Sequence, residues 1–293
     1  MTPSPQIMPL KNELVLVTGA STGMGKTTAQ ELARRGYHVL AGVRREVDAD
    51  RIRSDRIEPV ILDITVPDHI ESIATRIGQH SENRLLRAVV NNAGIAVNAP
   101  VEVLPLVEWR RQFEVNLFGH IAVTQAVLPF LIRSRGRIVN ITSVGGKIAM
   151  STYGAYAGAK FAFEAVSDAL RRELAPLGVR VVIVEPGGVT TEMAGRGIAT
   201  ANHLAEGMTG EQHRRYDDLI SAITAQAASF TKTGVPAEIA GRVIADTVTT
   251  RKPRIRYTIG RDAALLVHVV RVVTDRTLDA ILRRNLAPHY TKS

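Results

Sequence analysis

A tyrosine and a lysine stand four residues apart at Tyr156 and Lys160, and Ser143 lies thirteen residues upstream. On a helix, residues i and i+4 share one face, so the lysine ammonium is expected beside the tyrosine ring. A positive neighbour favours the phenolate, which matters because free tyrosine titrates near pH ~10 and exchanges protons poorly at neutral pH. Ser143 ends the apolar run 138–143, which is typical of a buried strand leading into a loop. We therefore expect Ser143 to hold a substrate oxygen while Tyr156 exchanges a proton with it.

Two observations limit what this spacing alone can establish. Helices that carry no chemistry also contain a tyrosine and a lysine four residues apart, so the weight of the pair depends on the motifs around it. Tyr153 lies seven residues before Lys160, on a similar helix face two turns away, and is the alternative proton donor. The closer spacing favours Tyr156.

A glycine-rich turn follows the first apolar run of the chain. Residues 14–17 predict a strand buried on both faces, Thr-Gly-Ala-Ser-Thr-Gly-Met-Gly occupies 18–25, and 26–35 predict a helix that ends at Gly36. A strand, a glycine-rich turn and a helix form the context of a dinucleotide-binding motif. There the glycines let the backbone approach a pyrophosphate, and the helix N-terminus offers free N–H groups. An ordinary tight turn is the alternative interpretation.

The same turn imitates the phosphate loop of nucleoside triphosphatases. Gly-Lys-Thr at 25–27 matches the end of that loop, and Asp63 after an apolar run matches its magnesium-binding aspartate. However, the loop requires a glycine at the position of Ala20, and Gly19 lies one residue too far back. This hypothesis also leaves the serine, tyrosine and lysine unexplained, so triphosphate hydrolysis is the less favoured function.

The order of the motifs along the chain resembles that of the short-chain dehydrogenase/reductase family. The resemblance covers roughly residues 12–260, and it implies hydride transfer between a nicotinamide cofactor and a carbonyl or alcohol substrate. The matching motifs are the glycine-rich turn, Asn91-Asn92-Ala93-Gly94, Asn116, Ser143, Tyr156 with Lys160, and Pro186-Gly187.

This resemblance implies a role for each matching catalytic residue. Tyr156 is then the acid/base, and Lys160 lowers its pKa and holds the nicotinamide ribose. Ser143 orients the substrate oxygen, while Asn116 supports a water that relays protons from Lys160. The alternative for Asn116 is a polar residue that bends its helix.

The family also implies which residues contact the cofactor. Asn91 steadies the central sheet beside it, Asp63 contacts the adenine, and Thr191 either contacts the nicotinamide carboxamide or caps a helix. Besides Tyr156 and Lys160, the expected cofactor-binding residues are Gly19, Ser21, Thr22, Gly23, Met24, Gly25, Arg44, Asp63, Ile64, Asn91, Ala93, Gly94, Pro186, Gly187, Val189 and Thr191.

The charge after the second apolar run indicates which nicotinamide cofactor is bound. The run 37–43 ends at Arg44 and Arg45, and no acidic residue occurs before Glu46. An acid there would accept hydrogen bonds from the ribose 2′-hydroxyl of NAD, whereas an arginine can bind a 2′-phosphate. We therefore expect NADPH/NADP+ rather than NADH/NAD+, the alternative being that both arginines are solvated loop charges.

Short apolar runs alternate with helical segments along the chain. This alternation predicts an α/β protein with a Rossmann-type, doubly wound parallel sheet in three α/β/α layers, within a single domain. Right-handed crossovers place the carboxyl ends of the strands, and so the candidate site, along one rim. The expected strands are 14–17, 38–43, 59–62, 88–91, 137–141, 179–184 and 255–259.

The domain organisation follows from the limits of this pattern. We expect a flexible arm over 1–11, the dehydrogenase domain over 12–260, and a basic helical extension over 261–293 packed on the same domain. The segment 190–235 within the domain is longer than an ordinary connection and is expected to form a mobile lid over the nicotinamide.

Composition and charge exclude several function classes. The 293 residues include no cysteine, which excludes thiol catalysis, thiolate metal sites and disulfides. The histidines lack a metal-ligand spacing and no secretory signal begins the chain, so we expect a cytoplasmic protein without a metal.

Residues 251–293 hold ten Lys/Arg and three Asp, which is +7 of the net charge of +9. Because these arginines alternate with apolar residues, we expect no dedicated nucleic-acid role. Residues 262–286 predict one basic amphipathic helix that either makes a weak contact with a membrane surface or packs on the protein.

The expected walls of the substrate site are mostly small and apolar. Residues 96–100 and 144–150 form them, with Lys147 as the exception, which favours a bulky hydrophobic ketone or alcohol. The tail 256–263 also resembles that of hydroxysteroid and retinol dehydrogenases. The family pairs subunits through helices such as 109–132 and 155–175, so we expect a homodimer or homotetramer. A non-catalytic NADP(H)-binding sensor is the alternative function, although it would have less need of all four catalytic side chains.

Overall fold

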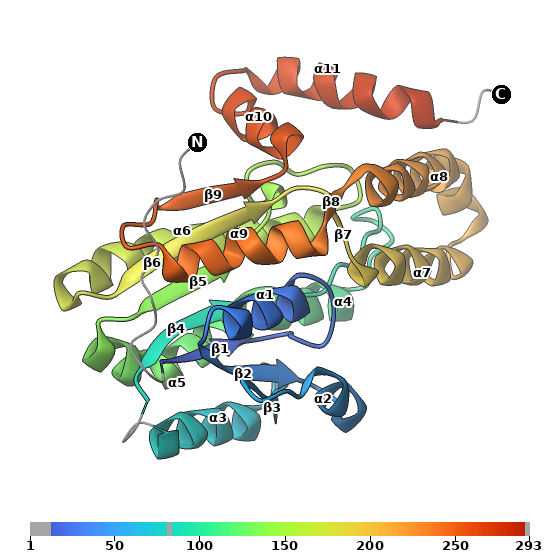
Figure 1. Ribbon diagram of the computed structural model, residues 1–293. Coiled ribbons are helices and arrows are strands. Elements are labelled where there is room, and N and C mark those ends of the chain that lie inside the picture. The colour runs from blue at the N-terminus through green and yellow to red at the C-terminus, as the bar shows by residue number, and fades with distance from the viewer. Residues whose placement is uncertain (1–12, 81–83, 291–293) are drawn as a thin grey trace.

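A seven-stranded parallel sheet forms the centre of the protein (Figure 1). The computed structural model describes residues 13–80 and 84–290, so the predicted arm over 1–11 lies outside the described residues. The strand order is β3-β2-β1-β4-β5-β6-β9, and a separate two-stranded parallel sheet pairs β7 with β8. The strands are β1 Leu14–Val17, β2 His38–Val43, β3 Ile57–Ile61, β4 Leu86–Asn91, β5 Arg137–Ile141, β6 Arg180–Pro186, β7 Val189–Thr190, β8 Val235–Pro236 and β9 Arg256–Ile259.

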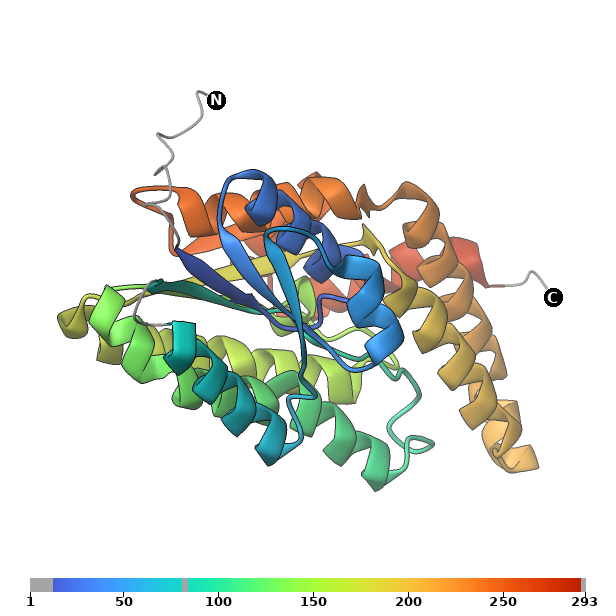
Figure 2. The ribbon, with the colours of Figure 1, turned by 60° about the horizontal axis from the view of Figure 1, so that its bottom comes forward.

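Helices cover both faces of this sheet, which confirms the predicted three-layer, doubly wound fold (Figure 2). One face carries α1 (Gly23–Arg34), α2 (Glu46–Ile52) and α9 (Ala237–Thr249). The other carries α3 (Pro67–His80), α4 (Leu106–Phe113), α5 (Gly119–Ser134) and α6 (Gly154–Leu174). The remaining helices are α7 Glu192–Glu206, α8 Gly210–Thr233, α10 Arg261–Val269 and α11 Asp275–Leu286, with the π-helix η1 Glu114–Phe118 and the 3₁₀ helices η2 Val144–Gly146, η3 Ala175–Leu177 and η4 Ala287–His289.

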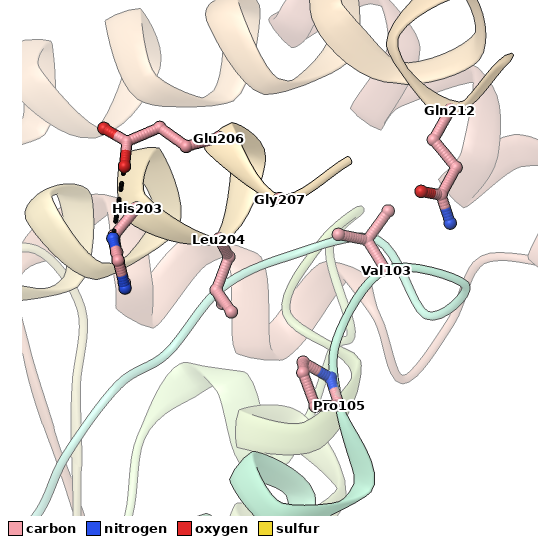
Figure 3. A pocket seen from close by; sticks show the side chains of 7 residues that line it. All are labelled: Val103, Pro105, His203, Leu204, Glu206, Gly207 and Gln212. Atoms are coloured by element: carbon pink, nitrogen blue, oxygen red, sulfur yellow. Dashed lines mark hydrogen bonds and ion pairs between the residues drawn. The ribbon is translucent and has the colours of Figure 1, made fainter. Parts of the chain in front are cut away.

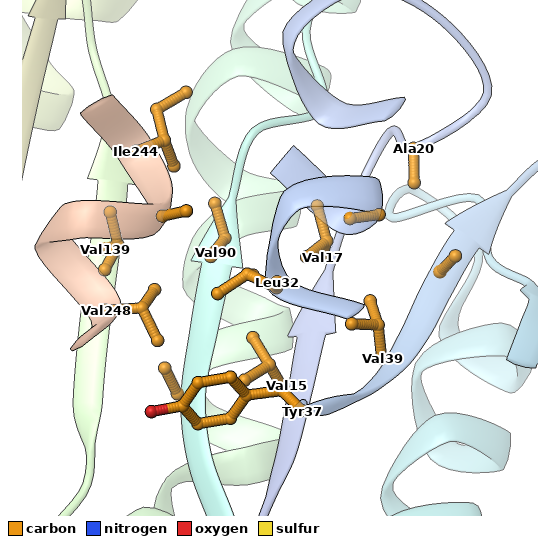
Figure 4. Close-up of a cluster of buried hydrophobic side chains, with 14 of the residues drawn as sticks. Val15, Val17, Ala20, Leu32, Tyr37, Val39, Val90, Val139, Ile244 and Val248 are labelled. Atoms are coloured by element: carbon orange, nitrogen blue, oxygen red, sulfur yellow. The ribbon is translucent and has the colours of Figure 1, made fainter. Parts of the chain in front are cut away.

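Two hydrophobic cores lie on opposite faces of the sheet. Successive side chains of a strand point to opposite faces, so Val15 and Val17 of β1 enter one core while Leu14 and Leu16 enter the other. Figure 4 shows the first core, where side chains from α1 and α9 pack onto the strands. Burial on both faces explains why β1 is a continuous apolar run and why its bounds could be predicted.

The order of the strands reverses beside β1, whose neighbours are β2 and β4. In open α/β sheets, ligands bind outside the carboxyl ends of the strands at such a reversal. The fold therefore directs the glycine-rich turn after β1 and the loop after β4 toward one crevice.

The helices α4, η1 and α5 form one continuous helix over Leu106–Ser134. Its 29 residues are long and apolar enough to cross a membrane by length and composition. However, Val123, Val127 and Leu131 on its inner face belong to the second core, packed against the sheet. The helix therefore serves as a core helix of the α/β fold.

Two segments differ from what the sequence predicts. The lid segment contains the helices α7 and α8, which lie side by side at the right of Figure 1, rather than a long loop. The single basic helix predicted over 262–286 is wrong, because α10 and α11 are separate helices. Thr274 starts the second one, and its hydroxyl accepts a hydrogen bond from the Thr277 N–H at 3.4 Å.

Candidate active site

Ser143 and Tyr156 meet at the carboxyl end of β5. Ser143 lies two residues beyond the strand, where its hydroxyl accepts a hydrogen bond from the Gly145 N–H at 2.9 Å. The hydroxyl of Tyr156, which projects from the first turn of α6, lies close enough to Ser143 for the serine to lower the pKa of Tyr156. A Cβ atom on Gly145 would lie 3.0 Å from the Tyr156 ring, so glycine gives the ring room to approach. The structure thus brings the predicted serine and tyrosine together.

Lys160 lies one turn further along α6, as the spacing predicts. Its Nζ donates to the carbonyl of Ile141 at 3.0 Å and lies 5.9 Å from the centroid of the Tyr156 ring. Burial lowers the pKa of Lys160 to about 8, although the carboxylate of Glu164 opposes that shift. The ammonium is therefore the major form at neutral pH and is lost in mildly alkaline solution.

The pKa of Tyr156 is raised in this structure, contrary to the lowering that the family resemblance implies. Burial raises it, and the hydrogen bond with Ser143 only partly opposes this effect. The Lys160 ammonium is held by the Ile141 carbonyl rather than by the phenol oxygen. Tyr156 consequently retains its proton at neutral pH and is equipped to act as a proton donor.

The alternative donor, Tyr153, faces a different part of the protein. Its side chain lies near Asn98, and it packs against the cluster of Ala222, Ile223 and Leu286 from α8 and α11. The rings of Tyr153 and Tyr156 meet edge to face with centroids 6.2 Å apart. Tyr153 therefore packs toward α8, while Tyr156 lies beside Ser143.

Asn116 is buried in the π-helical turn η1 and holds the loop after β4. Its Nδ2 donates to the carbonyl of Ile95 at 2.9 Å, and its Oδ1 accepts from the Ile95 N–H at 3.0 Å. Insertions of π-helix frequently occur at functional sites. The side chain thus positions the active-site wall, and the water relay from Lys160 stays a prediction.

The glycine-rich turn after β1 has a backbone that only glycine accommodates well. Gly19 and Gly23 adopt φ of +64° and +55°, in the left-handed region. A Cβ atom on Gly25 would lie 2.2 Å from the carbonyl oxygen of Gly19. The first turn of α1 contains no acidic residue. The turn and the helix N-terminus therefore offer a close, electropositive approach to a phosphate.

Thr18 and Asn92 lock this turn to the loop after β4, and sequence reasoning missed both roles. The Thr18 hydroxyl accepts hydrogen bonds from the N–H groups of Asn92 and Ala93 at 2.9 and 3.0 Å. In return, Asn92 Nδ2 donates to the carbonyls of Thr18 and Gly19. Their positions directly beyond two strand ends were the available signal.

Asn91 begins a buried chain of hydrogen bonds across the sheet. Its Nδ2 donates to Thr124 Oγ1 and to Asn140 Oδ1, both at 2.9 Å, and Asn140 Nδ2 donates to Ser167 Oγ at 2.8 Å. These bonds join β4, β5, α5 and α6 below the site. Asn91 thus lies where it can hold the sheet rather than touch a ligand directly.

The predicted cofactor residues after β6 line the crevice from the lid side. Gly187 follows the end of β6 at Pro186, and its N–H donates to the Ile259 carbonyl at 2.9 Å. Thr191 occupies the N-cap position of α7 without a capping hydrogen bond from its side chain, and its methyl group would lie 3.1 Å from a Cβ on Gly23. The base of the lid therefore contacts the glycine-rich turn. Val189 lies in β7, between Gly187 and Thr191 in the chain.

Two predicted cofactor residues turn their side chains into the cores instead. Met24 packs against the first core, and Ile64 is buried in the second, where it contacts Gly119. Apolar side chains at the edge of the site gain more from burial there. Ser21 and Thr22 lie in the turn between β1 and α1, where both are half-buried.

Arg44 and Arg45 differ in their partners. Arg45 forms two hydrogen bonds with the carboxylate of Asp48, at 2.7 and 2.9 Å. Arg44 is exposed, and among the residues that the structure describes it has no hydrogen bond or ion pair. Burial raises the pKa of Asp63, but hydrogen bonds from Thr65 and the nearby charge of Arg44 outweigh it and hold the pKa below its usual value. Arg44 is therefore the arginine left to bind a ligand.

The phosphate-loop hypothesis does not fit the position of Thr27. Its hydroxyl donates to the carbonyl of Ala237 at 2.8 Å, and its atoms lie within 2.5–2.8 Å of a Cβ built on Gly241. Thr27 therefore packs in the interface between α1 and α9, where it cannot bind a nucleotide-held magnesium ion.

A cavity of about 510 Å³ lies beside the lid, between the loop before α4 and the ends of α7 and α8 (Figure 3). His203 Nδ1 and Glu206 Oε2 are 3.2 Å apart at its rim. Ser143, Tyr156 and Lys160 do not line this cavity. Its lining residues are Val103, Pro105, His203, Leu204, Glu206, Gly207 and Gln212.

Comparison with known proteins identifies the family. A model of the family described as short chain dehydrogenase matches residues 13–201. Retinol dehydrogenase 7 of Mus musculus is 35% identical over 280 residues, covering 93% of this chain and 88% of its own. NADPH-dependent 3-dehydrocapnine reductase of Ornithobacterium rhinotracheale is 30% identical over 279 residues, covering 92% and 96%. A short-chain dehydrogenase structure from Streptomyces avermitilis superposes with a TM-score of 0.73 at 26% identity, covering 96% and 97%. The chain belongs to the short-chain dehydrogenase/reductase family of oxidoreductases.

Proposed function

We propose that the protein is an NADP(H)-dependent oxidoreductase that interconverts a ketone or aldehyde with the corresponding alcohol. The observation that carries this proposal is the placement of Ser143 beside Tyr156, with Lys160 one turn further along α6. Two convergent hydroxyls beside a buried ammonium are suited to proton exchange with a substrate oxygen.

The residues divide the work of moving a proton. Ser143 and Tyr156 hold the substrate oxygen through their hydroxyls, and Tyr156 donates the proton in the reductive direction or accepts it in the oxidative one. The Lys160 ammonium stabilises the phenolate that remains after donation. Bound NADPH supplies the hydride, and NADP+ accepts it in reverse. The same four side chains serve both directions, with Asn116 proposed to hold the water that replenishes the proton.

The residues of the crevice fit an NADP(H) molecule. The glycine turn, where any Cβ on Gly25 would collide with the backbone, and the N-terminus of α1 would hold the pyrophosphate. Arg44, which is exposed and not paired with a described carboxylate, would bind the 2′-phosphate. The NADPH-dependent reductase named above supports the same preference. We therefore propose NADP(H) in preference to NAD(H).

A bulky hydrophobic substrate agrees with the side chains around the site. Val97, Ile148 and Met208 are buried apolar residues on the surrounding loops and the lid. Lys147, the charged exception in the sequence, points to Glu164 at 2.6 Å rather than standing free. Relatives named as retinol dehydrogenases and as 17-beta-hydroxysteroid dehydrogenase type 6 support this substrate class.

We further propose a homodimer or homotetramer in the cytoplasm. A shallow cavity of about 270 Å³ on α4 and η1 is lined by three aromatic residues, of which Phe118 is half-exposed, and by two charged ones. The lining residues are Trp109, Arg110, Phe113, Glu114 and Phe118. Exposed aromatic residues of this kind are typical of subunit interfaces.

A fluorescence titration of the purified protein with NADPH, NADH and ATP–magnesium tests the proposal. Tighter binding of NADPH supports the assignment of Arg44, and hydrophobic ketones should then oxidise the bound NADPH. Tighter binding of NADH would reject the charge argument but keep the family. Binding of NADPH without turnover of any ketone or aldehyde would favour the sensor alternative, and binding of ATP–magnesium alone would reject the dehydrogenase mechanism.

A further inference from the structure

Helix α6 carries a third functional group in line with Tyr156 and Lys160. Glu164 follows Lys160 by four residues, so the three side chains share one face of the helix. The end of β5 and the residues just beyond it face all three. Ser143 lies beside Tyr156, the Ile141 carbonyl accepts from Lys160, and Thr142 Oγ1 donates to Glu164 Oε1 at 2.6 Å. The strand end and the helix are thus joined at three successive turns.

The second carboxylate oxygen of Glu164 binds two cations. Lys147 Nζ lies 2.6 Å and Arg256 Nη2 lies 3.0 Å from Oε2. The Glu164 side chain is only 6% exposed, so water screens these contacts weakly. Lys147 directly follows η2, in the segment after Ser143, and Arg256 begins β9. Glu164 therefore connects the catalytic helix to the serine segment and to the last strand.

Two more carboxylates complete this buried charge cluster. Glu185, near the end of β6, lies 3.6 Å from Lys147 Nζ and 3.2 Å from Arg256 Nε. Asp168 of α6 lies 3.1 Å from Arg256 Nη2. Asp168 also pairs with Arg171 at 3.4 Å, so three carboxylates face three cations, and burial together with the charge of Glu164 raises the pKa of Glu185. These ion pairs join α6 to β6, to β9 and to the segment after η2.

We propose that Glu164 is a positioning residue for the reaction proposed above: its carboxylate anchors the segment after Ser143 to α6 and places a negative charge one turn beyond Lys160. This inference rests on the proposed function for its catalytic meaning. The pKa values agree with it, because Glu164 raises the pKa of Lys160 while burial lowers it.

His120, which faces Lys160 from α5, cannot replace this negative charge. Burial and the Lys160 charge lower the pKa of His120 to about 3, so its ring is neutral. The ring stacks on Phe163 of α6 with centroids 4.8 Å apart. Among the groups discussed, the carboxylate of Glu164 is the one that keeps Lys160 protonated.

Glu164→Gln tests this role because glutamine keeps the oxygen that Thr142 bonds and removes the charge. We expect the pKa of Lys160 to fall by about one unit. The pH above which kcat declines should fall by the same amount. KM for NADPH should stay within about twofold, because the cofactor crevice is untouched. Glu164→Asp keeps the charge and should restore the wild-type pH dependence of kcat. Glu58→Gln is the matched control. Glu58 lies on the distant edge strand β3, and its carboxylate binds Arg76 at 2.5 Å.

The pKa of Lys160 can also be measured without turnover. The chain has seven lysines, so NMR titration of ¹³C-labelled lysine side chains resolves individual residues. Lys147→Met should move the pKa of Lys160 in the opposite direction, upward, because it leaves Glu164 less neutralised. This second variant keeps the inference testable if Glu164→Gln does not fold.

The outcomes separate this inference from the proposed function. A wild-type protein that turns over ketones while Glu164→Gln leaves both the pKa of Lys160 and the pH profile unchanged would overturn the inference alone. If the pKa of Lys160 shifts in the expected directions but the protein turns over no carbonyl compound, the proposed function is overturned. Glu164 then remains the group that keeps Lys160 protonated.

Discussion

Burial and charge act against each other at Lys160, and their balance sets the pH range of the site. Desolvation lowers the pKa of the ammonium to about 8, despite the nearby carboxylate of Glu164. Burial at the same time raises the pKa of Tyr156, which keeps the phenol protonated. At neutral pH the site therefore combines a charged lysine with a neutral tyrosine, the pair of states that reduction of a carbonyl requires.

We expect reductive turnover to fall as the pH rises through about 8, because Lys160 is charged below its pKa and neutral above it. The measurement is kcat against pH at saturating NADPH, from neutral to alkaline solution. Lys160→Arg is the control, since arginine stays charged in this pH range. The kcat of this variant should not decline as the pH rises through about 8, even if its maximal value is lower. A wild-type profile that stays flat well above this pH would show that the charge of Lys160 is not required.

Replacing Arg44 should weaken NADPH binding selectively. Arg44→Gln removes the guanidinium that is free to bind a 2′-phosphate, so the dissociation constant of NADPH should rise by about tenfold or more, and that of NADH should change little. Arg45→Gln is the matched control, because Arg45 is already engaged by Asp48. Equal losses of NADPH and NADH affinity in Arg44→Gln would show that the contact is not with the phosphate.

At this scale, the sequence predicts residues whose geometry is local. Ser143 lies beyond a strand end and Tyr156 and Lys160 obey the i, i+4 rule, so elementary helix and strand geometry brings them together. The role of Thr18 depends on hydrogen bonds to a loop 74 and 75 residues away. Glu164 likewise gains its role from partners on β5, η2 and β9. Such contacts leave no local pattern, so they could not be predicted.

Among the secondary-structure elements, the turn between β1 and α1 has the least freedom. Its glycines adopt positive φ, and the Gly25 position is closed by the Gly19 carbonyl and by the side chain of Asn92. The loop after β4 depends on this turn through Thr18. A change of shape in the turn therefore affects two walls of the crevice at once.

Gly25→Ala should abolish measurable NADPH binding and lower the melting temperature, because its Cβ would lie 2.2 Å from a backbone oxygen. Gly195→Ala on α7 is the control: among the described residues, its Cβ would have no neighbour within 4 Å. That variant should keep NADPH affinity and gain up to about 1 kcal/mol of helix stability. Fluorescence titration and thermal unfolding measure both effects, and NADPH affinity preserved in Gly25→Ala would refute the assignment of the turn.

Elements were predictable where burial made the pattern simple. The bounds of β1, β2 and β5 coincide with the predicted runs, because strands buried on both faces are mostly apolar. The lid helices were missed, since the long interval between Pro186 and Pro236 was interpreted as a loop. Thr209 and Gln212 form a capping box at the start of α8, with hydrogen bonds of 3.2 and 2.9 Å, which was a usable signal.

The whole molecule presents two contrasting surfaces. Exposed apolar residues gather on the outer side of η1 and α6, where Phe118 and Phe161 are 50% and 44% exposed. The C-terminal extension instead combines basic residues with exposed Leu265 and Val272. The first surface agrees with the proposed pairing of subunits. The weak membrane contact expected of the second stays a prediction, now for two short helices rather than one.

Phe118→Glu should dissociate the proposed oligomer, because a charge at the centre of an apolar interface remains without a partner. Size-exclusion chromatography with light scattering measures the mass, and the wild type should be a dimer or tetramer of the 31.8 kDa chain. Leu265→Glu on the C-terminal extension is the control and should leave the mass unchanged. A monomeric wild type would remove the proposed assembly.

The central claim, that Tyr156 exchanges the substrate proton, is tested most directly by deuteride transfer from 4-deuterated NADPH to hydrophobic carbonyl probes. Retinaldehyde and a steroid ketone are the probes, and mass spectrometry of the alcohol product measures the transfer. We predict that Tyr156→Phe lowers the rate by about 10²–10⁴-fold, the range of general acid catalysis, while NADPH still binds. Tyr153→Phe should retain turnover. Wild-type rates in Tyr156→Phe, or loss of the reaction only in Tyr153→Phe, would contradict the assigned mechanism.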